Sequence, residues 1–286
     1  MRLATILTDR GPRACGEFDG HYVDINHADS SLPSTVKGIL ALGPEGVRAV
    51  GLALPRGAWK HALTHPAILA PVPDPAKIVC LGLNYRDHAA ESGMDAPSEP
   101  ILFSKYATAL IGPGAPIVLP GSSREVDYEA ELVVVVGRGG KDIAVDRAMG
   151  HVGGYAVGND VSARDWQLGK PGKQWMAGKT FDTFAPVGPV VVTPDEVPDP
   201  HNLPIRLKLN GRTMQDSNTD QLIFRVDFAI AYLSRIFTLE PGDLIFTGTP
   251  PGVGMARKPP VWLGDGDSVE VTIEGLGTLT NPVVRR

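Results

Sequence analysis

Short apolar runs separated by turn residues make up most of the chain. Near the N-terminus, the runs ACGEF and HYVDI flank Asp19-Gly20. Aspartate followed by glycine tolerates the positive φ angles of a tight turn, so these runs are predicted to form a β-hairpin. A short helix is predicted near Thr35 to Leu42.

A proline-rich segment follows, HPAILAPVPDPAK, which contains Pro66, Pro71, Pro73 and Pro75. Proline lacks a backbone donor and keeps the chain extended, which is typical of a linker. We therefore expect a domain boundary near residue 70. It would separate a small α+β N-terminal domain, residues 1–70, from a larger domain, residues 71–286.

The run KIVCLGLNY is typical of a buried strand that leads into a short helix. We expect this helix to extend from Tyr85 to Ser92. Asn84 is its predicted cap, and Gly93 is its predicted stop, because glycine readily adopts the left-handed conformation found after helix ends.

The one long helix that the pattern predicts spans Leu222 to Phe237. Apolar residues recur there with the helical period, as on the buried face of an amphipathic helix. The residues just before it offer side-chain caps, namely Ser217, Asn218 and Thr219.

The remaining apolar runs are typical of strands. ELVVVVG is a continuous β-branched run, as in a strand covered on both faces. GYAVGND and GDLIF are shorter strand-like runs, and DSVEVTIEGLGTLTNPV is predicted to form a closing hairpin. With 33 glycines and 26 prolines among 286 residues, which imply many turns, these runs predict a β-rich α+β fold.

Composition narrows the class of protein. An apolar fraction of 43% is ordinary for a globular chain, and a formal net charge of −5 argues against a nucleic-acid partner. The two cysteines, Cys15 and Cys80, are too few for a disulfide framework and are predicted to be buried. Proline, glycine or a charge interrupts every apolar run before it could span a membrane, so we expect a cytoplasmic protein without membrane contact.

Carboxylates at alternate positions lead into the ELVVVVG run. Asp127, Glu129 and Glu131 are spaced by two, so on one strand they would project from the same face. Carboxylates that enter the interior together repel one another unless a cation lies among them. The spacing alone is equally typical of a solvated strand end, but Asp160, at the end of GYAVGND, is well placed to converge with them. Oxygen ligands without a cysteine or histidine pattern favour Mg²⁺ or Mn²⁺ over zinc.

Other polar residues are candidates for the same site, each with a simpler alternative. Glu91 lies three residues after His88 and could orient its imidazole as a general base, although such pairs are also frequent surface contacts. Lys179 lies among aromatic and small residues, where an ammonium group needs an anionic partner unless it reaches the surface. Arg164 and Gln167, in SARDWQ, are equally compatible with an exposed helix.

The loop TGTPPGVG offers backbone amides and the hydroxyls of Thr247 and Thr249. Neither this loop nor GRGGKD has the GxxxxGK[ST] pattern of a phosphate-binding loop. We therefore expect no nucleotide site.

Several motifs in this order resemble the fumarylacetoacetate hydrolase family: GLNYRDHAAE, DYEAELVVVVG, GNDVSARDWQ, KTFDTFAPVGP, NGRTMQDSNTDQLIF and GDLIFTGTPPGVG. The likeness begins near Pro75 and continues to the end of the chain, while the N-terminal part is less diagnostic. It implies a mixed β-roll or barrel as the C-terminal domain, in a protein that is usually dimeric. We therefore expect a homodimer.

The resemblance also implies a role for each candidate residue. Glu129, Glu131 and Asp160 match the family's metal ligands, and the expected ion is Mg²⁺, or alternatively Mn²⁺ or Ca²⁺. His88 and Glu91 match a pair that activates water, on a segment that can order as a lid over the substrate. The remaining matches are to groups near the substrate: Lys179 beside the reacting carbonyl, Thr249 as a substrate contact, and Arg164 and Gln167 in the pocket wall.

These features predict a hydrolase that cleaves the carbon–carbon bond of a 2,4-diketo acid, either an acylpyruvate or a 2,4-diketo-3-deoxy sugar acid. The metal would polarise the 2-keto group, the His88–Glu91 pair would activate water, and pyruvate would leave as a metal-bound enolate. Two alternatives use the same site, namely decarboxylation of oxaloacetate or a similar 2-keto acid, and hydration or isomerisation of a 2-keto-enoic acid. If the protein is not an enzyme, the alternative is a β-rich binding module.

Overall fold

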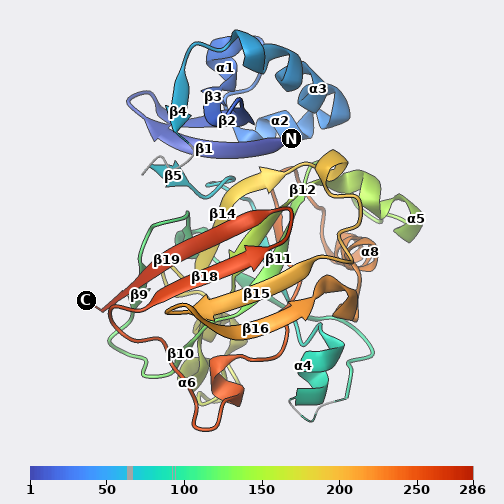
Figure 1. Cartoon of the computed structure of the whole chain (residues 1–286). Helices are drawn as coiled ribbons and strands as arrows, with labels where there is room; N and C mark the ends of the chain where they lie inside the picture. The colour runs from blue at the N-terminus through green and yellow to red at the C-terminus, as the bar shows by residue number, and fades with distance from the viewer. Residues whose placement is uncertain (63–66, 92, 94, 286) are drawn as a thin grey trace.

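The computed structural model describes residues 1–62, 67–91, 93 and 95–285. Figure 1 shows a smaller N-terminal part, in blue, above a larger body built mainly from strands. Strands and short helices alternate along both parts. This architecture confirms the predicted β-rich α+β class.

In the described part of the chain, 12 strands form one mixed sheet that runs through both parts of the molecule. Ten of them follow one another in the order β4 (Lys60–Ala62), β3 (His21–Asp24), β2 (Gly11–Phe18), β1 (Arg2–Thr8), β14 (Ala185–Val192), β12 (Val152–Asn159), β11 (Ala130–Val136), β17 (Leu244–Phe246), β6 (Ile78–Gly82) and β7 (Ile101–Lys105). β5 (Ile68–Leu69) pairs with β1, and β8 (Leu110–Ile111) pairs with β14. The pairing of β1 with β14 joins the two parts, and the domain boundary near residue 70 stays a prediction.

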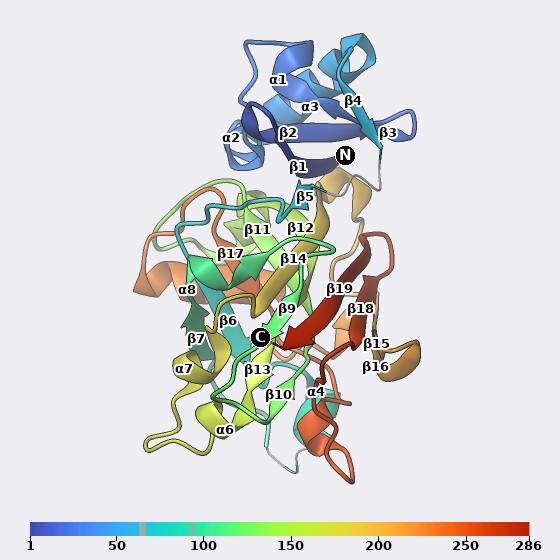
Figure 2. The ribbon, with the colours of Figure 1, turned by 90° about the vertical axis from the view of Figure 1, so that its left-hand side faces the viewer.

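A second sheet of 5 strands covers one face of the first within the described residues. Its order is β16 (Arg212–Asn218), β15 (Pro204–Leu209), β18 (Ser268–Ile273), β19 (Gly277–Arg285) and β9 (Ile117–Leu119). Figure 2, turned by 90°, shows this sheet beside β14, β12 and β11, which it contacts. A short pair, β10 (Val126–Asp127) with β13 (Ser162–Ala163), lies near the acidic segment.

Strand β11 lies between two hydrophobic cores, and all 7 of its residues are buried. Leu132 and Val134 pack into the core between the two sheets, while Val133 and Val135 pack into the core that includes helix residues Ile39 and Leu40. Alternate side chains of a strand point to opposite faces, so a continuous apolar run is required here. The prediction of a strand covered on both faces is confirmed.

The described residues include 8 α-helices and 6 short 3₁₀ helices. The α-helices are α1 (Ile25–Ala28), α2 (Val36–Ala41), α3 (Gly43–Ala53), α4 (Arg86–Glu91), α5 (Val145–Ala148), α6 (Arg164–Gln167), α7 (Trp175–Lys179) and α8 (Val226–Ile236). The 3₁₀ helices are η1 (Leu54–Arg56), η2 (Ala107–Ala109), η3 (Met149–His151), η4 (Pro194–Glu196), η5 (Thr219–Gln221) and η6 (Gly254–Ala256). The prediction of a single long helix is wrong, because α3 has 11 residues, as many as α8. Three glycines weaken the helical signal of α3, and burial of Val50 and Ala53 stabilises it instead.

The predicted local elements of the N-terminal part and the C-terminal hairpin are confirmed. Asp19 and Gly20 both adopt positive φ, 50° and 71°, in the turn between β2 and β3. Helix α2 begins after Thr35, whose side chain accepts a hydrogen bond from Gly38 N. β18 and β19 form the closing hairpin.

Helix α8 begins four residues later than the apolar period predicts, and its predicted caps are wrong. Leu222 forms a β-bridge with Tyr85, which holds this part of the chain extended. Ser217 and Asn218 belong to β16, and Thr219 opens η5. The first amide of α8, Val226 N, donates instead to His201 Nε2 at 3.1 Å, a contact between segments that local sequence does not reveal.

Asn84 does not cap α4, contrary to the prediction. Its side-chain amide donates to Phe224 O at 3.0 Å and Thr247 O at 2.7 Å, so it links three segments of the body. The helix ends at Glu91, and Gly93 follows with a φ of 62°, as expected of a stop. The predicted last residue, Ser92, lies outside the described residues, as does Pro66 of the predicted linker.

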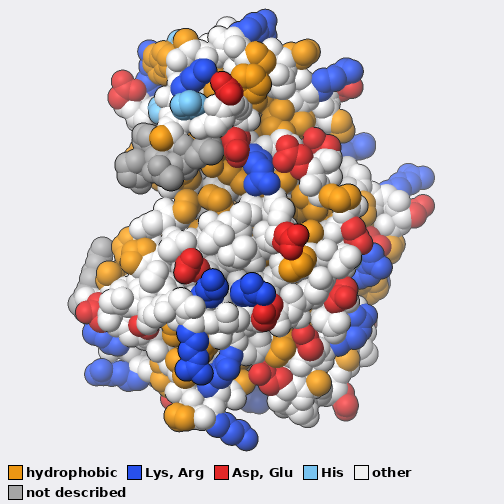
Figure 3. Space-filling view, in the orientation of Figure 1, with side chains coloured by type: hydrophobic (Ala, Val, Ile, Leu, Met, Phe, Trp, Pro, Cys, Tyr) orange, Lys and Arg blue, Asp and Glu red, His pale blue; other side chains and the backbone are white. Residues whose placement is uncertain are grey.

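Figure 3 shows one face of the molecule, on which basic side chains lie among acidic ones. Arg206 and Asp216, for example, form an exposed ion pair of 2.9 Å between β15 and β16. The expectation of no nucleic-acid partner stays a prediction. Both cysteines are buried, as predicted. Among the described residues, no helix combines the length and apolarity needed to cross a membrane.

Candidate metal and substrate site

Three carboxylates meet where β11 and β12 lie side by side. Glu131 is on β11, Glu129 lies just before it, and Asp160 directly follows β12. Because Ala130 pairs with Asn159, the two strands bring these side chains together, and one oxygen of each lies within 4.8 Å of the others. All three residues are buried. The predicted convergence of Asp160 with the acidic segment is confirmed.

Asp127, Glu129 and Glu131 do not lie on one strand, so that part of the prediction is wrong: β10 ends at Asp127, and β11 begins at Ala130. The strand is interrupted after β10, because side chains take the backbone amides that a neighbouring strand would bind. Glu129 N donates to Asn159 Oδ1 at 3.0 Å, and Ala130 N donates to Gln215 Oε1 at 2.8 Å. Asp127 accepts hydrogen bonds from the amides of η6 and shares Arg164 with Glu129.

Two buried cations connect these carboxylates. Lys179 Nζ lies 2.7 Å from Glu129 Oε2 and 2.8 Å from Asp160 Oδ2. Arg164 donates to Asp127 Oδ2 through Nε at 2.9 Å and to Glu129 Oε1 through Nη2 at 2.6 Å. Burial raises the pKa of Glu129, but Lys179 and Arg164 outweigh burial and hold that pKa at about 2. Glu129 is thus ionised and fixed from both sides.

A third buried cation, Lys105 at the end of β7, was not predicted. Its Nζ lies 2.6 Å from Asp160 Oδ1, yet it donates its hydrogen bonds to the carbonyls of Val161, Lys179 and Phe184. Three carbonyls use all three N–H groups of an ammonium. Asp160 Oδ1 is therefore a buried carboxylate oxygen that accepts no hydrogen bond.

Glu131 has no cationic side chain as an ion-pair partner among the described residues, and its Oε2 accepts a hydrogen bond from Gly248 N at 2.7 Å. Burial, followed by the charges of Asp160 and Glu129, raises its pKa well above the ordinary value. The cluster thus holds four carboxylates against three cations, and Asp160 Oδ1 accepts no hydrogen bond although it lies 2.6 Å from Lys105 Nζ. A divalent cation would compensate Glu131, the carboxylate of the cluster without a cationic partner among the described residues, and all-oxygen ligands suit Mg²⁺, Mn²⁺ or Ca²⁺, so Glu129, Glu131 and Asp160 fit such an ion.

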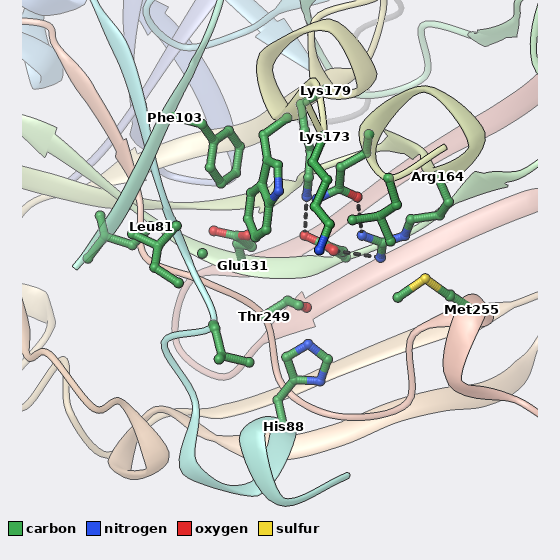
Figure 4. A pocket seen from close by; sticks show the side chains of 16 residues that line it. Leu81, His88, Phe103, Glu131, Arg164, Lys173, Lys179, Thr249 and Met255 are labelled. Atoms are coloured by element: carbon green, nitrogen blue, oxygen red, sulfur yellow. Dashed lines mark hydrogen bonds and ion pairs between the residues drawn. The ribbon is translucent and has the colours of Figure 1, made fainter. Parts of the chain in front are cut away.

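His88 and Glu91 lie on α4 at the mouth of the same site. His88 Nδ1 is 3.3 Å from Glu91 Oε2, and both oxygens of Glu91 accept from Gly252 N at 3.1 and 3.0 Å. With Nδ1 directed to the carboxylate, Nε2 is left to exchange a proton, and the imidazole points into the pocket in Figure 4. The geometry that the predicted pair requires is present.

The glycine-rich loop at residues 247–254 supplies three backbone amides to these carboxylates. Gly248 N donates to Glu131, Gly252 N to Glu91, and Gly254 N to Asp127 at 2.7 Å. A Cβ on Gly254 would lie 1.9 Å from Val261 O, and one on Gly248 would lie 2.7 Å from Asn84 Cβ. Glycine is therefore required at both places for the close approach. The loop's amides serve acidic side chains of the protein itself.

The family model described as Fumarylacetoacetate (FAA) hydrolase C-terminal matches residues 77–284. The chain belongs to the fumarylacetoacetate hydrolase family. The resemblance predicted from the motifs is thereby confirmed, and the match includes every candidate site residue.

The chain is similar to curated members of this family over most of its length. It is 49% identical to a mitochondrial oxaloacetate tautomerase of Xenopus laevis over 265 residues, which are 93% of this chain and 83% of that protein. It is 48% identical to a mitochondrial oxaloacetate tautomerase of Homo sapiens over 265 residues, 93% of this chain and 84% of that protein.

Solved structures of the family share the whole fold. A fumarylacetoacetate hydrolase from Exiguobacterium antarcticum is 35% identical with a TM-score of 0.85, and each chain covers 100% of the other. A maleylpyruvate hydrolase from Sphingobium is 33% identical with a TM-score of 0.81, again over 100% of both chains.

In this family member, one pocket joins the carboxylate cluster to the His88–Glu91 pair (Figure 4). Predicted site residues that line it are His88, Glu129, Glu131, Arg164, Gln167, Lys179 and Thr249. Glu91 and Asp160 lie behind them and contact His88 and Lys179, respectively. Gln167 accepts from Arg164 Nη1 at 2.9 Å, and Thr249 Oγ1 accepts from Gln215 Nε2 at 2.9 Å. Arg164 and Gln167 are thus buried, which removes the alternative of an exposed helix.

The residues of the site that were missed include Lys105, Gln215 and Lys173. Lys105 ends the apolar run ILFSK, and a lysine that closes a buried strand is a signal that could have found it. Gln215 lies on β16, far from the acidic motif in sequence, and carries no local signal. Lys173 lies in an exposed loop of the kind that usually carries solvated charges.

Proposed function

We propose that this chain catalyses the divalent-metal-dependent interconversion of the enol and keto forms of oxaloacetate or a closely related 2-keto acid. One observation carries the proposal. A chain about half identical to oxaloacetate tautomerases brings a carboxylate cluster suited to a metal and a histidine–carboxylate pair into one pocket. This observation supports the isomerase alternative more than the carbon–carbon bond hydrolase expected from the motifs.

The reaction requires a proton to leave the 2-hydroxyl of the enol and a proton to join C3, with no carbon–carbon bond broken. A divalent cation held by Glu129, Glu131 and Asp160 would supply positive charge beside the 2-oxygen. The imidazole of His88 lines the pocket and can both accept and donate a proton through Nε2, so we assign the proton transfer to it. Glu91 keeps Nδ1 occupied, so Nε2 faces the substrate.

The buried cations prepare the site rather than move the proton. Burial lowers the pKa of Lys179, but Asp160 and Glu129 outweigh burial and raise it, so this side chain stays charged. Arg164 is held in the same way by Glu129 and Asp127. Both keep Glu129 ionised and correctly oriented, and such fixed charges need no reorganisation during the reaction.

The second candidate is the predicted hydrolase of 2,4-diketo acids. The specific observation in its favour is the His88–Glu91 pair, which could activate a water molecule as well as carry a proton. Similarity to a maleylpyruvate hydrolase supports it in addition. Oxaloacetate decarboxylation is the third reaction that the same pocket could support.

The test follows the enol form of oxaloacetate by its ultraviolet absorbance after dilution from dry solvent, with Mg²⁺ or EDTA present. We expect loss of the enol well above the spontaneous rate with Mg²⁺, and an approximately hundredfold decrease in His88→Ala. His151→Ala is the matched control, because His151 bonds Arg138 O at 2.8 Å outside the pocket. Its rate should equal that of the wild type.

Pyruvate release is measured in parallel to separate the rival reactions. Pyruvate from oxaloacetate would indicate decarboxylation, and pyruvate from an acylpyruvate would indicate the hydrolase. No acceleration of any reaction by the metal-loaded protein would contradict the proposal and favour a binding module. The homodimer and the cytoplasmic location also stay predictions, and light scattering on the purified protein tests the dimer.

A further inference from the structure

The loop between α6 and α7 brings a lysine into the pocket in an unusual backbone conformation. Lys173 has a φ of 53° and follows Gly172, whose φ is 77°. Its amide donates to Lys170 O at 3.0 Å, and its carbonyl accepts from Trp175 N at 3.0 Å. A left-handed lysine costs about 1 kcal/mol, so the surrounding turn determines where this side chain points. Figure 4 shows it reaching into the pocket alongside Lys179 and Arg164.

The three lysine and arginine side chains that line the pocket differ in what they bind. Arg164 and Lys179 are buried and paired with carboxylates of the protein. Lys173 is exposed to the pocket and has no carboxylate partner in the described part of the chain. Its positive charge is thus available to a ligand, whereas the other two are already compensated.

The rest of the outer pocket is largely apolar. Leu81, Phe103, Trp175 and Met255 line it, and the rings of Phe103 and Trp175 lie 5.6 Å apart. A carboxylate at the distal end of a substrate would lose hydration among these side chains unless a cation paired with it. A neutral acyl group would not need such a partner.

We propose that Lys173 is a specificity-determining residue that binds the second carboxylate of a dicarboxylic 2-keto acid. This inference rests on the proposed function, which puts the 2-oxygen of the substrate beside a cation held at the acidic cluster. Lys173 then separates dicarboxylic substrates from monocarboxylic ones. Because Lys173 is exposed, the ion pair gives a moderate preference that falls as salt screens it.

The test compares two 2-hydroxy acids that share one end and differ at the other. Malate carries a second carboxylate, and lactate does not. Dissociation constants are measured by calorimetry on the Mg²⁺-loaded protein for the wild type, Lys173→Met and Lys173→Arg. Lys170→Met is the matched control, since Lys170 is exposed on the same loop but stacks on Trp166 and does not line the pocket.

We expect the wild type to prefer malate and Lys173→Met to bind it about five- to tenfold more weakly, with lactate changed less than about twofold. Lys173→Arg should keep most of the preference for malate over lactate, and Lys170→Met should keep all of it. Added salt should reduce the preference of the wild type. An equal loss for both ligands, or no loss, would overturn the inference. So would a wild type that binds both acids equally.

Failure of the proposed function gives a different result. If enol oxaloacetate is not turned over while the malate preference still depends on Lys173, the proposed reaction is wrong and the binding role stands. If turnover is observed and the preference does not depend on Lys173, the reaction stands and this inference is wrong.

Discussion

The floor and the rim of the pocket are built in opposite ways. We call the buried ionic residues of the pocket the floor. They lie on or beside strands of the large sheet, or on short elements next to that sheet: Lys105, Asp127, Glu129, Glu131, Asp160, Arg164 and Lys179. The rim comprises His88, Glu91, Lys173, Trp175 and Met255, on short helices and loops. Each cation of the floor binds two or more groups of the protein. The ring of His88, in contrast, has one partner among the described residues, Glu91, at the longer distance of 3.3 Å. We infer that the floor contributes mainly to stability and charge, and the rim to proton transfer and choice of substrate.

The largest expected effects separate two carboxylates of the floor. Glu129→Gln and Glu131→Gln should each lower metal-dependent activity about a thousandfold, because each removes a charged ligand. Their stabilities without metal should differ. Glu129→Gln weakens the pairs with Lys179 and Arg164 and should cost about 2 kcal/mol, whereas Glu131→Gln removes the carboxylate that lacks a cation and should not destabilise.

Urea unfolding in EDTA measures the difference in stability between the two variants. The same measurement with Mg²⁺ tests whether each protein is stabilised by the metal. The wild type should gain stability with Mg²⁺, and neither variant should. Equal destabilisation of the two variants in EDTA would show that Glu131 is compensated after all and would contradict the charge imbalance described for the floor.

A second prediction concerns Lys105, the floor residue that was not predicted. Lys105→Met should lower stability by about 3 kcal/mol, because it removes a charged donor from three buried carbonyls, of which Phe184 O keeps a second donor, and removes one cation from Asp160. Lys141→Met is the matched control. Lys141 also donates to two carbonyls, of Ser234 and Arg235, but it is 43% exposed, so its loss should cost less than about 1 kcal/mol.

Chemical denaturation of both variants gives the comparison. A similar small loss for Lys105→Met and Lys141→Met would mean that water reaches the floor and replaces the lysine. That result would remove the distinction between floor and rim on which the other predictions rest.

The floor was also easier to predict from sequence than the rim. Acidic residues that run into a buried β-branched strand create a conflict visible in the sequence, and that conflict identified Glu129 and Glu131, while Asp160 was identified by its place at the end of GYAVGND. The strand break between Asp127 and Ala130 depends on Asn159 and Gln215, which are distant in sequence, so it could not be predicted from the local sequence. The late start of α8 also depends on a contact between distant segments, the β-bridge between Leu222 and Tyr85. Lys173 could not be identified because an exposed loop lysine has no distinguishing pattern.

A small change in stability is also expected for Glu91, a residue of the rim. Glu91→Gln keeps an oxygen that can accept from Gly252 N, and the side chain is 29% exposed, so stability should fall by less than about 1 kcal/mol. The variant loses the charge that favours the active orientation of His88, so turnover of enol oxaloacetate should still fall about tenfold. Unfolding curves and initial rates on the same preparation measure both quantities. A decrease of several kcal/mol in the free energy of unfolding would mean that Glu91 stabilises the protein as the floor residues do. Full activity would show that His88 needs no carboxylate to hold its proton. The 3.3 Å contact between His88 and Glu91 would then be incidental.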